Sequence, residues 1–216
     1  MEPDAVEIRV LGCLIEKQRT TPDVYPLTLN ALRLACNQST NRDPVVDYDD
    51  STIRAALERL GRRKWTTLAS WSNRRAMKYR HTLDSALGLS EPELAVLCVL
   101  MLRGPQTPGE LKQRTERLHA FARLDGIEDT LRGLIDRELV AQLPRRPGQR
   151  EERYRHVLGG GAEEEPAATP APSAAREQEP APASDGLERR VARLEDELAS
   201  LRADLRALRG DLGAAE

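Results

Sequence analysis

A six-residue stretch that reads KYRHTL at residues 78–83 recurs as RYRHVL at residues 153–158, 75 positions further along the chain. Upstream of each copy, three apolar residues with helical spacing recur at an offset of 74: Ile53, Leu57 and Leu60 match Ile127, Leu131 and Leu134. Two matches in the same order indicate an internal repeat, so we interpret the first 158 residues as two copies of one folding unit.

The first copy predicts three helices followed by a β-hairpin. Apolar periodicity and capping residues indicate helices over 5–18, from Pro26 to Cys36, and over 52–63. Residues 65–69 and 76–82 are predicted as strands on either side of a short turn. Three helices and then a hairpin is the order of a winged helix-turn-helix domain.

The second copy predicts the same order. Ser90 precedes a helix over 91–103, Thr107 and Pro108 open the next helix, and Asp125 caps a helix over 126–138. Strands are expected at 139–143 and 151–158. The expected fold is therefore mainly α with small β-hairpins, as tandem winged helix-turn-helix domains over residues 1–86 and 87–158.

The composition changes after Leu158. Residues 159–186 are rich in Pro, Gly and Ala and hold no apolar side chain larger than Ala, which predicts a disordered linker. Over 187–213, apolar residues are spaced alternately by four and three, which predicts a C-terminal coiled-coil helix and favours a homodimer. The alternative is a lone amphipathic helix that lies on the folded body. The predicted dimerisation seam consists of Leu187, Val191, Leu194, Leu198, Leu201, Leu205, Leu208 and Leu212.

Several runs resemble a known family. They include TTP at 20–22, ACNQ at 35–38, RGPQTPGEL at 103–111 and PGQRE at 147–151. These runs closely resemble the signature of the YceH-like family of uncharacterised bacterial proteins. The resemblance covers about residues 5–158 and implies two winged-helix domains. It implies function only weakly, because that family has no settled activity.

Charge divides the chain unevenly. The whole chain has 33 Lys and Arg against 35 Asp and Glu, which excludes a uniformly basic nucleic-acid coat. The first 158 residues carry a balance of +4 and the remaining residues −6. A mildly basic body therefore precedes an acidic tail.

Cations gather on the third predicted helix and the hairpin of the first domain. A winged helix usually places these two elements on DNA, so we predict contact with duplex DNA and the role of a transcriptional regulator. The predicted DNA-binding residues are Arg54, Arg59, Arg62, Arg63, Lys64, Arg74, Arg75 and Lys78, with Arg145, Arg146 and Arg150 on the second hairpin. The plainer interpretation is a solvated helix face.

The second domain is a poorer candidate for DNA. Its third predicted helix exposes a mixed set of charges, which favours protein contact or packing against the first domain: Glu128, Asp129, Arg132, Asp136 and Arg137. The alternative function is therefore a tandem winged-helix protein-interaction module that binds no DNA. The polar runs at 16–18 and 37–38 are expected to satisfy backbone groups or to form bonds between the domains.

No residue pattern points to catalysis, a cofactor or a metal. The three cysteines and three histidines are scattered without ligand spacing, and the odd number of cysteines suits a reducing cytoplasm. The longest apolar run, residues 94–102, is too short to cross a bilayer. We therefore expect a cytoplasmic, non-enzymatic protein without a membrane partner.

Overall fold

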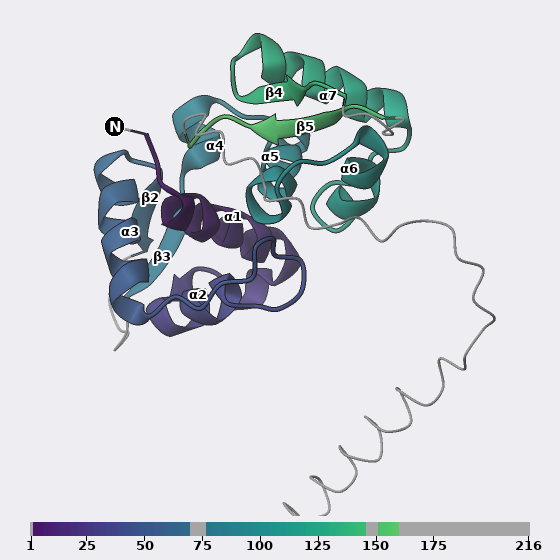
Figure 1. Cartoon of the computed structure of the whole chain (residues 1–216). Coiled ribbons are helices and arrows are strands. Elements are labelled where there is room, and N and C mark those ends of the chain that lie inside the picture. The colour runs from purple at the N-terminus through teal and green to yellow at the C-terminus, as the bar shows by residue number, and fades with distance from the viewer. Residues whose placement is uncertain (1, 70–76, 146–150, 160–216) are drawn as a thin grey trace, which may run out of the picture. The chain divides into compact units, whose positions relative to one another are not determined.

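The computed structural model describes residues 2–69, 77–145 and 151–159 (Figure 1). Over these residues the fold is mixed α/β, with seven α-helices and two small antiparallel sheets. The predicted linker from residue 160 onward, the coiled-coil helix and its seam lie outside the described residues. So do four predicted DNA-binding residues at the hairpin tips: Arg74, Arg75, Arg146 and Arg150.

The first repeat runs from α1 to β3. Its elements are α1 (Ala5–Thr20), a 3-10 turn η1 (Pro22–Val24), β1 (Leu27–Thr28), α2 (Leu29–Cys36), α3 (Asp50–Arg62), β2 (Thr66–Ala69) and β3 (Lys78–His81). The three strands form an antiparallel sheet in the order β1-β3-β2. The sheet therefore has one more strand than the predicted hairpin.

Two predicted helix starts in the first repeat are corrected. Pro26 does not open α2, because the next two residues form β1, in which Leu27 pairs with Tyr79. The helix begins after Thr28, whose hydroxyl accepts a hydrogen bond from the Ala31 amide at 3.3 Å. In α3 the cap is Asp49, which accepts from the Thr52 amide at 2.8 Å.

The second repeat runs from α5 to β5, and a short helix that sequence reasoning missed, α4 (Leu83–Leu87), precedes it. Its elements are α5 (Glu91–Arg103), α6 (Pro108–Thr115), α7 (Leu124–Asp136), β4 (Val140–Leu143) and β5 (Arg153–His156). Asp125 is not the cap of α7, since it lies in the first turn and Arg123 occupies the capping position.

The strand registers confirm that the two copies fold alike. Thr66 pairs with His81 in the first repeat, and Val140 pairs with His156 in the second. The β1 pairing with Tyr79 also has a counterpart, an isolated antiparallel bridge between Gln106 and Tyr154. The repeat therefore extends from the sequence to the pairing of individual strand residues.

The two repeats are joined through α1 and α5, which pack against each other (Figure 1). Nine consecutive residues are buried in each helix, residues 7–15 in α1 and 94–102 in α5. Gly12 allows this close approach, because a Cβ atom there would lie 2.8 Å from Cδ2 of Leu102. We call this contact between α1 and α5 the joint.

Candidate nucleic-acid interface

The amphipathic character of α3 fixes which of its side chains face solvent. Four apolar residues of α3, Ile53, Ala56, Leu57 and Leu60, are buried in the core that α1 and α2 complete. The opposite face exposes Arg54, Glu58 and Arg62, and Lys64 is exposed just beyond the helix end. Within the described residues, neither Arg54 nor Arg62 has an ion-pair partner.

Two other predicted DNA-binding residues turn away from this open face. Arg59 lies between two carboxylates at the start of α1, with Nη2 2.6 Å from Oδ2 of Asp4 and Nε 3.2 Å from Oε2 of Glu7. The Arg63 Nε atom lies 3.6 Å from Oε1 of Glu7, and its guanidinium group lies 5.7 Å from the Trp65 ring centroid. Because the Glu7 side chain is only 3 % exposed, these pairs hold α3 against α1.

The strand β3 adds cations beside α3. Lys78 is half-buried, and Arg80, which sequence reasoning missed, is exposed. Alternate residues of a strand point to the same face, so Lys78 and Arg80 share one face of β3. The two-residue spacing was the signal that could have identified Arg80.

On the corresponding surface of the second repeat, three of the described cations are paired with carboxylates. Arg145 lies 3.0 Å from the Glu152 carboxylate across the base of the hairpin. On α7, Arg132 pairs with Asp129 at 2.9 Å, and Arg137 reaches Glu93 of α5 at 2.8 Å. These pairs compensate much of the charge of Arg132, Arg137 and Arg145. Arg155, the counterpart of Arg80, is half-buried and has no ion-pair partner among the described residues.

The repeat offset makes this difference specific. The bounds of α3 and α7 differ by 74 positions at both ends, so outward residues can be matched one to one. Three exposed cations of the first repeat correspond to three exposed carboxylates: Arg54 to Glu128, Arg62 to Asp136, and Lys64 to Glu138. Lys64 and Glu138 even share a left-handed backbone, with φ of 61° and 56°.

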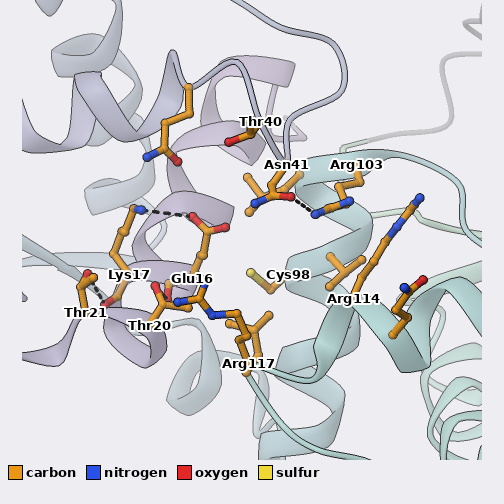
Figure 2. Close-up of a pocket in the computed structure, with 15 residues that line it drawn as sticks. Glu16, Lys17, Thr20, Thr21, Thr40, Asn41, Cys98, Arg103, Arg114 and Arg117 are labelled. Carbon is orange, nitrogen blue, oxygen red and sulfur yellow. Dashed lines mark hydrogen bonds and ion pairs between the residues drawn. The ribbon is translucent and has the colours of Figure 1, made fainter. Parts of the chain in front are cut away.

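A buried polar network supports the loop between α2 and α3. The Arg42 side chain is fully buried; it donates to the Ala35 carbonyl at 3.1 Å and to both Glu16 carboxylate oxygens at 3.1 and 2.6 Å. Asn37 Nδ2 donates to the Tyr48 carbonyl at 2.9 Å, which confirms the expectation that this polar run satisfies backbone groups. Glu16 also lines a cavity at the joint (Figure 2).

Of the two repeat-equivalent histidines, His81 is buried and His156 is half-buried. His81 Nε2 lies 2.5 Å from Oε1 of Gln18, and burial lowers the pKa of His81 to about 4. Burial likewise lowers the pKa of His156 to about 4. Both residues are therefore neutral at physiological pH.

Within the described residues, no group of three or more His, Cys, Asp or Glu side chains is placed so that it could hold a metal ion. The free cysteines Cys13, Cys36 and Cys98 are all buried. Among the described helices, none has the length and apolar character needed to cross a bilayer.

Comparison with known proteins places the chain in a family. A family model described as "Protein of unknown function, DUF480" matches residues 4–149. A UPF0502 protein of Pelobacter propionicus is 55% identical over 156 residues, which cover 71% of each chain. A UPF0502 protein of Geobacter metallireducens is 50% identical over 198 residues, 90% of this chain and 88% of its own. A third, from Shewanella sp. strain MR-4, is 44% identical over 207 residues, 92% of this chain and 93% of its own. The chain therefore belongs to the DUF480/UPF0502 family of uncharacterised bacterial proteins.

Proposed function

We propose that this protein binds duplex DNA through the outer face of α3 and the neighbouring strand β3. The observation that carries the proposal is the set of cations that face solvent there without carboxylate partners among the described residues: Arg54, Arg62, Lys64 and Arg80. Phosphate contacts from Lys and Arg supply most of the affinity of such interfaces, and an arginine can also read guanine edges.

The proposal includes a winged-helix assignment for each repeat. Its support is the order of elements in the first repeat, a helix, a strand, two helices and two strands, with β3 between β1 and β2. In helix-turn-helix proteins the recognition helix lies in the major groove. Here that helix would be α3, which lies on the side of α1 away from α5 (Figure 1).

The affinity of one chain for DNA should be modest. Arg59 and Arg63 lie against Asp4 and Glu7, so their charges are largely compensated. A homodimer formed through the seam over 187–213 would link two such faces and raise their effective concentration on DNA. This part of the proposal predicts a dimer in light scattering and a monomer after truncation at Leu158.

The proposal is tested by titrating a fluorescently labelled duplex with the full chain at several salt concentrations. We expect binding that weakens steeply with salt. Replacing Arg54 and Arg62 by Ala should weaken binding about tenfold and lower the salt slope by roughly two, since each phosphate contact contributes about one.

The matched control replaces Arg123 and Arg132 by Ala, which removes the same charge from exposed positions of the second repeat. This control should bind nearly as well as the parent chain. No binding at low salt, or equal losses in the two variants, would contradict the proposal. A partner captured from nuclease-treated cells by a chain that binds no DNA would favour the protein-interaction module instead.

A further inference from the structure

A cavity of about 600 Å³ lies at the joint, on a different surface from the proposed DNA face. One wall comes from the end of α1 and from the loop after α2, and the other from α5, α6 and the turn beyond α6 (Figure 2). The volume is in the range of small-molecule sites in proteins, about 300–1,000 Å³. We call this space the joint cavity.

The charge of its lining is strongly positive. Four cationic side chains line the joint cavity: Lys17 from α1, Arg103 from α5, Arg114 from α6 and Arg117 beyond α6. Among the described lining residues Glu16 is the only carboxylate, and the buried guanidinium group of Arg42 takes up both of its oxygens. Lys17 also lies 3.8 Å from the same carboxylate, and Arg114 lies 3.6 Å from Glu110 of its own helix. Arg103 and Arg117 are therefore the lining cations that have no ion-pair partner among the described residues, and the cations of the lining outnumber its carboxylates.

Arg103 illustrates the lack of compensation. Its guanidinium group donates to the neutral side-chain amide of Asn41, across the two walls of the cavity (Figure 2). Burial, and then the positive charge of Arg114, lower the pKa of Arg103 below its ordinary value. Arg114 is itself paired with Glu110, but the distance between Nη2 of Arg114 and Oε1 of Glu110 is 3.6 Å, which is too long for a good hydrogen bond. An anion in the cavity would relieve this crowding of like charges.

The remaining lining limits the kind of anion. Thr40 and Gln113 offer neutral polar groups, and Val99, Leu102 and Leu118 provide an apolar side. No aromatic side chain is found among the lining residues in the described part of the chain, so nothing there could stack on a nucleotide base. The lining suits a compact molecule with several anionic groups better than a nucleotide.

We propose that the joint cavity binds a small organic polyanion that carries phosphate or carboxylate groups. Lys17 belongs to the first repeat and Arg103, Arg114 and Arg117 to the segment after α4, so a bound anion would bridge the two walls. The ligand would stabilise the folded chain by mass action, and its binding needs no DNA. The inference therefore stands apart from the proposed function.

The test is calorimetric titration of the full chain, without DNA, by pyrophosphate and separately by citrate. We expect saturable binding in the millimolar range or tighter, and a rise in the unfolding temperature at saturation, both measured against sodium chloride of equal ionic strength. A stronger response to pyrophosphate identifies phosphate groups as the preferred chemistry, and a stronger response to citrate identifies carboxylates.

A pair of charge-matched variants locates the site. Replacing Lys17 and Arg117 by Gln should weaken binding at least about tenfold, as loss of two charge-assisted contacts implies. Replacing Lys112 and Arg132 by Gln removes the same charge from residues outside the lining and should change binding less than about twofold. Circular dichroism checks that both variants fold.

Two results would overturn the inference. One is the absence of heat and of thermal stabilisation with both anions at millimolar concentration. The other is an equal loss of binding in the two double variants, which would mean that the anions respond to net charge and not to the joint cavity.

Discussion

The helices α3 and α7 bury the same pattern and expose opposite charges. Each has 13 residues, and three buried apolar positions of α3, Ile53, Leu57 and Leu60, have apolar counterparts 74 residues later. Outward, three cations of the first repeat become three carboxylates in the second. The comparison teaches that burial preserves the fold of a repeat while its solvent face is free to change, so the two repeats need not share a partner.

The largest expected effect concerns the joint that holds both repeats. A valine at position 12 would place Cβ within 2.9 Å of two Leu102 side-chain atoms, so Gly12→Val should destabilise the chain by about 1–3 kcal/mol. Urea unfolding measures this change. Gly61→Ala and Gly133→Ala are the controls in α3 and α7; with open space around both glycines, they should stabilise by about 0.5–1 kcal/mol. A valine that is tolerated without loss would mean that α1 and α5 are not closely packed.

An effect that shows itself only in acid compares the equivalent histidines of the two repeats. Burial lowers both folded-state pKa values from 6.5 to about 4. Above pH 6.5 both residues are neutral in the folded and unfolded states, so they add no pH dependence. As the pH falls from 6.5 towards 4, only the unfolded chain takes up these protons, and stability should fall by roughly 2–3 kcal/mol per histidine.

Chemical unfolding at several pH values tests this comparison. In His156→Phe, the fall in folding stability below pH 6.5 should be smaller by the contribution of one histidine. His81→Phe should remove the contribution of the other histidine, but it also loses the contact with Gln18 and should be less stable at neutral pH. An unchanged pH profile in His156→Phe would contradict the burial of that ring.

The smallest effect sharpens the contrast between the two faces. Glu7→Gln removes the carboxylate that lies near both Arg59 and Arg63, so the surface of the first repeat becomes more positive. DNA affinity should rise roughly two- to fivefold, with a steeper salt dependence. Glu116→Gln, an exposed change in the second repeat, is the control and should leave affinity nearly unchanged. A fall in affinity with Glu7→Gln would show that these arginines do not add to the DNA face.

Much of the fold could be predicted because apolar spacing and capping residues are local. The α5 helix was predicted at residues 91–103, the bounds that the structure gives, because Ser90 and Glu93 form a capping box. The strand β1 could not be predicted, since its two residues are strand only through their pairing with β3. The cap of α7 was predicted wrongly at Asp125, because an aspartate is a local signal for a helix cap. In the structure the helix starts earlier, and Arg123 occupies the capping position.

The candidate site was harder to predict than the fold. Helical spacing correctly placed Arg54 and Arg62 outward, but it could not show that Arg59 reaches Asp4, which is 55 residues away in sequence. The joint cavity was missed for the same reason. Its cations come from segments that only the packing of α1 on α5 brings together, and Arg42 gives no sequence signal that it is buried.

The most direct test of the DNA proposal places the α7 charges on α3. The variant carries Arg54→Glu, Arg62→Asp and Lys64→Glu, and it is compared at low salt with Lys112→Glu, Arg123→Glu and Arg132→Glu, which change the net charge equally. The account predicts that labelled duplex DNA binds the first variant about 100-fold more weakly than the parent chain and the control variant less than about fivefold more weakly. Equal affinities for the two variants would contradict it.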